Sequence, residues 1–139
     1  MGTRCLTVFA DENEKEIAVL YRQFDGYPGG HGVELAEILC PKGRDRGISN
    51  GISGDKFNGA GCLAAEVVGR FKVLKVLGRS ELAGGFYLEP AGTRDVGEEF
   101  VYTVRPRGAD VIVECSDSEG KILFAGPAPA FRKWAREQK

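Results

Sequence analysis

Four short β-type segments lie close together in the last part of the sequence and constrain the fold more than any other feature. They are Gly85–Glu89, Glu98–Val104, Ala109–Ser116 and Lys121–Ala125. Each alternates apolar and polar residues or is rich in β-branched residues, as strands are. The turn-forming residues of Arg105–Gly108 and Asp117–Gly120 separate the last three segments and are typical of hairpins. This series predicts an antiparallel sheet.

The first part of the chain predicts one more hairpin and a helix. Thr3–Phe9 and Ile17–Phe24 are β-rich, and the acidic run Asp11–Glu16 between them fits an exposed turn. In the second strand, alternation places Ala18, Leu20 and Arg22 on one face and Ile17, Val19 and Tyr21 on the other. After a break rich in Gly and Pro, helical spacing predicts a helix over about Val33–Cys40, which Pro41 stops.

A second helix is predicted from near Gly61 to at least Phe71, while Phe71–Leu77 fits a helix or a strand. Pro127 and Pro129 then introduce a short C-terminal helix with Phe131 and Trp134 on its apolar side. Because strands do not alternate with helices, the class is α+β. We expect one domain over residues 1–139, with an antiparallel sheet, two central helices packed on one face and the C-terminal helix at its end.

Composition excludes several classes of protein. The 139 residues carry 19 Lys plus Arg and 20 Asp plus Glu, so the net charge of −1 argues against bulk nucleic-acid binding. No run approaches the roughly 18 apolar residues of a membrane span, and the start MGTRCLTVF does not resemble a signal peptide. We expect a cytoplasmic protein. The four widely spaced cysteines predict free buried thiols and no metal site, and nothing indicates a cofactor.

Glycine marks the candidate site. Ten of the 20 glycines lie between Gly26 and Gly61, and Gly29, Gly30 and Gly32 lead into the first predicted helix. Free N–H groups at a helix start suit a phosphate or carboxylate, although the same glycines also fit a tight turn without a ligand. The neighbouring His31 is the one histidine, and it fits either a general base or a structural group of that turn.

Cys62 begins the second predicted helix after two glycines, and it could pair with His31 as a nucleophile. That pair would make the chain a hydrolase or transferase. The alternative is a small buried residue beside Leu63–Ala65, and we predict this second case: a buried, slowly reacting thiol.

Arginine and aromatic residues supply a second set of candidates. Guanidinium groups bind phosphate bidentately, and aromatic rings stack on nucleobases. The candidate ligand-binding residues are Arg22, Tyr27, Gly29, Gly30, His31, Arg44, Arg46, Phe57 and Arg105. We expect Arg22, the glycine turn and at least one further arginine to line one pocket, within one chain or across a subunit boundary.

The segments Tyr21–Gly32 and Asn58–Ala65, with the pattern YRxFDGYPxGHG…NGxGCLAA, resemble small bacteriophage and prophage proteins. Gly85–Leu88 and Glu98–Val104 match the rest of the pattern, so the resemblance covers most of the chain. It implies a phage context, in which small proteins often counter host defence in the host cytoplasm, and it supplies no catalytic residues.

The first hypothesis is therefore a non-enzymatic, homo-oligomeric binding protein that sequesters a phosphorylated small molecule such as a nucleotide signal. The second is the Cys62/His31 enzyme. The third is an inhibitor of a host defence protein that acts through a direct protein interface.

Overall fold

The computed structural model describes residues 2–41, 47–52, 56–74 and 84–138. Six strands form one sheet in the order β3-β2-β1-β4-β5-β6. The strands are β1 (Cys5–Ala10), β2 (Glu16–Arg22), β3 (Phe86–Glu89), β4 (Phe100–Arg107), β5 (Asp110–Asp117) and β6 (Ile122–Pro127). All neighbouring pairs are antiparallel except β1 and β4, which run parallel. The predicted α+β class is confirmed, and the sheet is antiparallel as predicted except at the β1–β4 pair.

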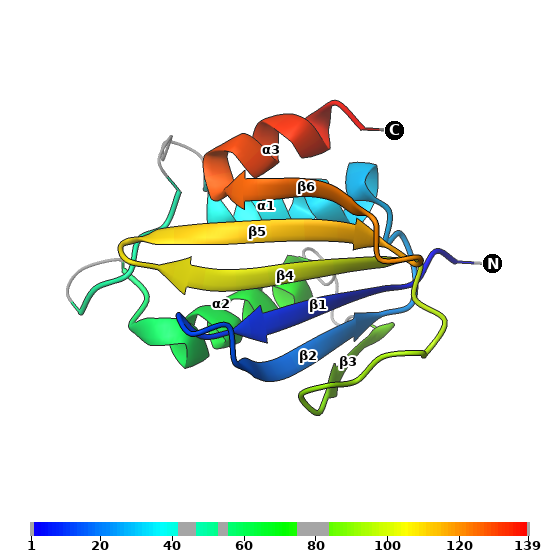
Figure 1. The fold of residues 1–139 in the computed structure, drawn as a ribbon, viewed down its shortest axis with the longest axis horizontal. Helices are drawn as coiled ribbons and strands as arrows, with labels where there is room; N and C mark the ends of the chain where they lie inside the picture. Colours follow the sequence, from blue (N-terminus) through cyan, green and yellow to red (C-terminus); the bar gives the residue numbers. More distant parts are fainter. Residues whose placement is uncertain (1, 42–46, 53–55, 75–83, 139) are drawn as a thin grey trace.

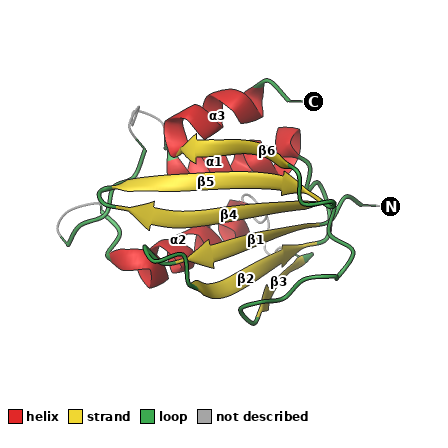
Figure 2. Cartoon of the chain, in the orientation of Figure 1, coloured by secondary structure: helices red, strands yellow, loops and turns green. Residues whose placement is uncertain are grey.

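The helices α1 (Val33–Leu39) and α2 (Gly59–Leu74) lie behind the sheet in Figure 1, and α3 (Ala128–Arg136) lies beyond β6. Figure 2 shows that no helix of the described residues covers the opposite face of the sheet. The predicted helix boundaries agree to within about two residues, and α2 extends to Leu74. Residues 75–77, where the sequence fitted either state, lie outside the described part.

The connection between β3 and β4 accounts for the parallel pair. The two strands run in the same direction on either side of the β1–β2 hairpin, so residues 90–99 must return along the sheet. We call this connection the strap. Arg94 in the strap forms an ion pair with Glu16 of β2 at 2.9 Å, and Glu99 N–H donates to the carbonyl of Arg4. The strap is thereby tied to β2 and to the residue just before β1.

The main core lies between the sheet and the helices. Period-two alternation sends Cys5, Thr7 and Phe9 of β1 to the helical side, where Phe71 of α2 and Phe131 of α3 are fully buried. Leu6, Val8 and Val19 form a smaller cluster on the other face. The apolar faces of the helices thus bury one side of the sheet, and any polar side chain on that side needs a partner in the core.

Candidate ligand-binding site

The turn that follows β2 carries polar groups into the core. Asp25 has a positive φ of 62°, and Gly26 N–H donates to the carbonyl of Thr3. A Cβ at Gly26 would lie 2.7 Å from the Cβ of Cys5, so only glycine permits this approach to β1. Pro28–Gly32 then form one π-helical turn that runs into α1. As a result, the side chain of His31 points under the sheet and is fully buried.

The His31 ring is held at both nitrogens. Nε2 lies 2.7 Å from Oγ1 of Thr7, and Nδ1 lies 3.1 Å from NH1 of Arg22. Because a guanidinium can only donate, Nδ1 must accept and the ring proton must reside on Nε2, which donates to Thr7. The ring also stacks on Phe71, with centroids 4.6 Å apart and planes 10° apart. His31 is therefore a neutral imidazole fixed in one tautomer.

Arg22 connects this histidine to α1. Its side chain is 2 % exposed, and its NH1 and NH2 donate to the two carboxylate oxygens of Glu34 at 2.8 and 3.3 Å. The guanidinium carbon lies 5.0 Å from the ring centroid of Phe86 and 5.9 Å from that of Phe71. A buried guanidinium with a paired carboxylate and two aromatic neighbours has its charge compensated and its plane fixed.

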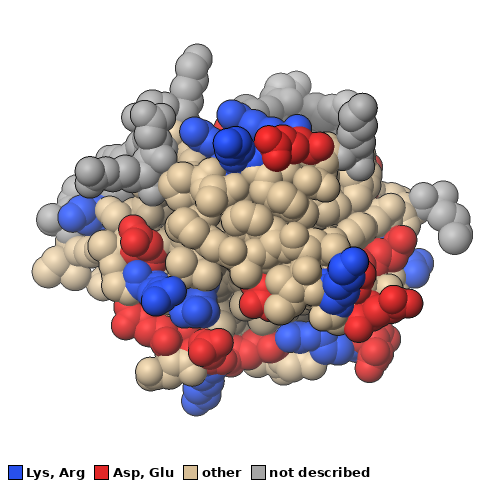
Figure 3. All heavy atoms as spheres, turned by 45° about the horizontal axis from the view of Figure 1, so that its top comes forward, with Lys and Arg blue, Asp and Glu red and all other residues tan. Residues whose placement is uncertain are grey.

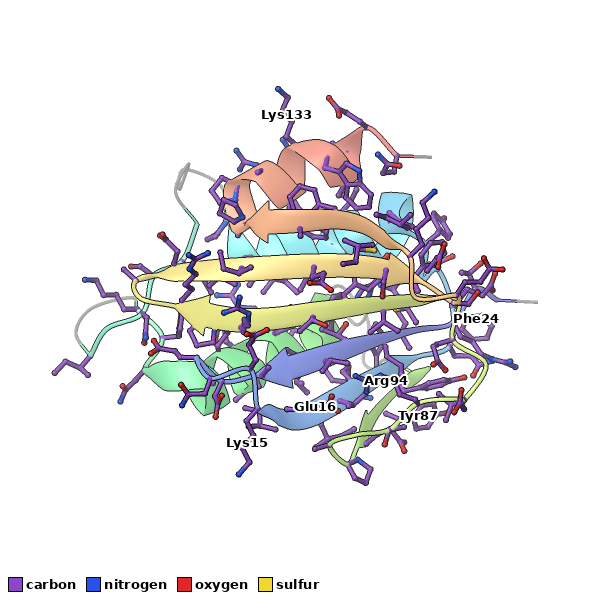
Figure 4. All side chains as sticks on the ribbon, viewed as in Figure 1. Lys15, Glu16, Phe24, Tyr87, Arg94 and Lys133 are labelled. Carbon is purple, nitrogen blue, oxygen red and sulfur yellow. The ribbon has the colours of Figure 1, made fainter. Side chains whose placement is uncertain are left out.

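A pocket of about 310 Å³ opens beside this guanidinium. Its described lining residues are Arg22, Phe24, Asp25, Gly84, Gly85 and Phe86. Phe24 is 55 % exposed, and Figure 4 places it at the end of the sheet where the N-terminus lies. The pocket therefore combines an aromatic surface open to solvent, a carboxylate and the edge of a buried cation. This volume is at the lower end of the range for small-molecule sites.

The arrangement does not favour catalysis by His31. A histidine base accepts a proton at its unprotonated ring nitrogen, but here Nδ1 already accepts from Arg22 and Nε2 carries the proton that it donates to Thr7. Burial raises the pKa of Cys5 and Tyr102 above their ordinary values and raises the pKa of Cys115 to about 12. These groups are neutral at physiological pH and supply no nucleophile.

The structure separates His31 from Cys62. His31 stacks on Phe71, which lies nine residues after Cys62 on α2, or about 13 Å along the helix axis. The two side chains are thus beyond hydrogen-bond reach, and the proposed pair does not form. The predicted burial of Cys62 is wrong, because the residue is exposed. Leu63 and Val67 are buried on the side of α2 that faces the sheet. Cys62 immediately precedes Leu63, so its side chain points about 100° away from that side.

Cys62 instead lines a second pocket of about 330 Å³. Its described lining residues are Ile48, Lys56, Phe57, Cys62, Glu66 and Arg70. The predicted stacking residue Phe57 lies here, with only 4 % of its surface exposed. Phe57 and Arg22 therefore line different pockets.

The other predicted residues are divided among several places. Tyr27, Gly29 and Gly30 lie on the turn before α1 but are not among the described lining residues of the Arg22 pocket. Arg105 lies on β4 between the buried Val104 and Pro106, so it faces away from the helices, whereas Arg22 faces them. One chain therefore does not bring Arg105 to the Arg22 pocket. Arg44 and Arg46 lie outside the described residues.

Sequence reasoning missed two partners of this site, Thr7 and Glu34. Thr7 alternates with Cys5 and Phe9, and this pattern was enough to place a hydroxyl on the core side of β1. Glu34 carried no such indication, because it does not lie on the apolar face of the predicted helix. Its side chain is 30 % exposed and reaches Arg22 along the helix surface.

Charge and comparisons give no further indication of a ligand. On the face drawn in Figure 3, Lys and Arg alternate with Asp and Glu around a broad uncharged area. Within the described residues, no three His, Cys, Asp or Glu side chains are placed to hold a metal ion, and no helix is long and apolar enough to cross a membrane. No protein-family model, no curated protein and no solved structure matches this chain.

Proposed function

We propose that this protein captures a phosphorylated small molecule, such as a nucleotide signal, in the Arg22 pocket without transforming it. The observation that carries the proposal is the meeting of Arg22, Phe24 and Phe86 at one pocket of about 310 Å³. Aromatic stacking and a guanidinium donor are the two contacts that nucleotide ligands use most. The role as a phage antagonist of host defence rests on the sequence resemblance and belongs to the same proposal.

Each lining group has a task in this scheme. The exposed ring of Phe24 stacks on a nucleobase, and the carboxylate of Asp25 accepts from a ribose hydroxyl or an exocyclic amine. Gly84 and Gly85 allow the ligand to approach the backbone closely. Arg22 donates to the phosphate or to a base carbonyl. Because Glu34 and His31 already hold it, its geometry is preorganised before the ligand arrives.

Sequestration fits the site better than turnover. Nε2 of His31 donates a proton, Cys62 lies in another pocket, and the buried thiols are neutral. A homo-oligomer is part of the proposal, because a second copy is the route by which Arg105 could reach this pocket.

The test is isothermal titration calorimetry of the full chain with a panel of nucleoside monophosphates, nucleoside diphosphates, cyclic dinucleotides and the parent nucleosides. We expect at least one phosphorylated member to bind and its parent nucleoside to bind more weakly. Phe24→Leu and Asp25→Asn should weaken that binding without unfolding the protein, since both residues are exposed and asparagine tolerates the positive φ of Asp25. Losing the stacked ring should weaken binding by about 1–3 kcal/mol.

Tyr27→Leu is the matched control, because Tyr27 is a partly exposed aromatic residue on the same connection and is not among the described lining residues. A tight ligand recovered chemically unchanged, with binding sensitive to Phe24 and insensitive to Tyr27, supports the proposal. A panel that shows no binding, or a Phe24→Leu variant that binds as tightly as the wild type, overturns it.

A further inference from the structure

A second small pocket lies on the other face of the sheet, where two tyrosines meet. Tyr21 of β2 and Tyr87 of β3 are directly opposite in the antiparallel register, and their ring centroids are 5.7 Å apart with planes tilted by 47°. The hydroxyl of Tyr21 donates to Oε1 of Gln23 at 2.6 Å, which fixes that ring. Tyr87 is 55 % exposed, and Figure 4 places it on β3 at the lower edge of the sheet. The tilted rings therefore form an open aromatic corner.

Glu89 and Val96 complete the corner. Together with the two tyrosines they line a pocket of about 190 Å³. Glu89 lies two residues beyond Tyr87 on the same strand and thus on the same face. Within the described part of the chain, its carboxylate makes no ion pair or hydrogen bond. The pocket therefore presents two aromatic surfaces and one uncompensated negative charge.

The strap holds the Val96 side of the pocket in place. The N–H groups of Val96 and Asp95 donate to the carboxylate of Glu98 at 2.8 and 3.1 Å. The nearest strap cation, Arg94, is bound to both carboxylate oxygens of Glu16, so its charge is already neutralised. The wall is ordered before any ligand enters, and no free positive charge from Arg94 opposes a cation.

We propose that the pocket of Tyr21, Tyr87, Glu89 and Val96 binds an alkylammonium group, that is, a compact organic cation with methyl groups on nitrogen. Aromatic faces attract cations through the ring quadrupole, and aromatic corners with a carboxylate are the usual receptors for methylated ammonium groups. Glu89 disfavours phosphates and other anions, because no cation stands beside it among the described lining residues. This site is independent of the proposed nucleotide pocket, because Arg22 faces the helices and Tyr21 faces away from them.

Shape distinguishes an alkylammonium from the other common organic cation, a guanidinium. A planar guanidinium stacks on one ring, whereas a round ammonium head touches both faces of a tilted pair at once. The volume of about 190 Å³ is roughly six times the share of one water molecule in the liquid. It therefore accommodates a head group of about five or six non-hydrogen atoms, such as tetramethylammonium.

The experiment follows the methyl proton resonance of tetramethylammonium by NMR as the full-length protein is added. We expect a saturable upfield shift, because the methyl groups would lie over two ring faces, with binding in the millimolar range that weakens as salt is raised. Tyr87→Leu should weaken binding about two- to fivefold, the factor expected for one exposed cation–π contact. Glu89→Gln should weaken it as well and should reduce the dependence on salt.

Two ligands and one variant serve as controls. 2,2-Dimethylpropanol has a similar shape without charge and should not bind, and guanidinium should bind more weakly than tetramethylammonium. Phe24→Leu changes an equally exposed aromatic residue in the other pocket and should leave the shift unchanged. The proposal is overturned by an absent shift, by equal binding of the neutral alcohol, by guanidinium binding as well as the ammonium, or by unchanged binding in both pocket variants.

Discussion

Replacing Thr7 with valine tests the buried polar network most directly. Valine has nearly the same shape as threonine and favours strands, so Thr7→Val removes one hydroxyl from β1 without opening a cavity. The hydroxyl accepts the Nε2–H of His31 at 2.7 Å, and both side chains are fully buried. After the change, that N–H has lost an acceptor in a site that water does not reach.

The expected cost follows from the loss of that acceptor. Leaving a buried polar group without its partner costs about 1–3 kcal/mol. The ring cannot avoid the loss by changing tautomer, because NH1 of Arg22 donates to Nδ1 and would then meet another N–H. For a chain of this length, 1 kcal/mol corresponds to roughly 3–5 °C in Tm. A loss of about 2 kcal/mol therefore lowers Tm by roughly 6–10 °C.

The assay is urea denaturation followed by circular dichroism, together with thermal melting. Thr103→Val is the matched control, because Thr103 is a half-buried residue on the neighbouring strand β4 that faces away from the helices. We expect this control to change the free energy of unfolding by less than about 0.5 kcal/mol. Nitrogen NMR of His31 adds an independent measurement, and it should show the proton on Nε2 in the wild type.

Equal stabilities of Thr7→Val and Thr103→Val would refute the reasoning. A wild-type spectrum with the proton on Nδ1 would refute it too, because the assignment of Arg22 as donor to that nitrogen would then be wrong. In that case His31 could accept a proton at Nε2, and the argument against its role as a base would have to be withdrawn.

Three further predictions follow from the same contacts. Glu34→Gln should destabilise the protein by about 1–3 kcal/mol in urea denaturation, because it removes the charge opposite the buried Arg22. Its control is Glu37→Gln at the exposed pair with Arg136, which should cost less than about 0.5 kcal/mol. Equal effects of the two variants would contradict the difference in burial. The hydrogen bond from Arg94 lowers the pKa of Glu16. At Glu98 burial acts to raise the pKa, but its own backbone N–H and the N–H groups of Val96 and Asp95 outweigh that effect. Both groups therefore have folded pKa values below their unfolded ones. The two carboxylates therefore stabilise the fold above the unfolded pKa of about 4.5, and this stabilisation is lost as the pH falls through their folded pKa values. In Glu16→Gln the free energy of unfolding should fall less steeply below about pH 4.5. An unchanged slope would exclude Glu16 as a contributor. Among the four cysteines, Cys62 is exposed, so a thiol reagent should modify one thiol rapidly in the native protein and the other three only after unfolding, and Cys62→Ser should abolish the rapid phase.

The sequence alone predicted the local structure well because local structure depends on nearest neighbours. Alternation placed Leu20 and Arg22 on the same face of β2, and both are buried on the helical side. Turn residues between β4, β5 and β6 set the hairpins, and helical spacing found α1 and α2. The sequence also marked Arg22 and His31 as candidates, and the structure joins them.

Other features required the tertiary structure because they depend on segments far apart in the chain. The parallel pairing of β1 with β4 depends on the strap, which carries no periodic pattern of its own. The partner of His31 is a hydroxyl 24 residues away, and nothing near either residue in the sequence indicates that contact. Cys62 shows the same limit: the residues beside it suggested burial, but the direction in which α2 faces the sheet left it exposed. Spacing along the chain determines which face a side chain takes, whereas the packing of one element on another determines what that side chain meets.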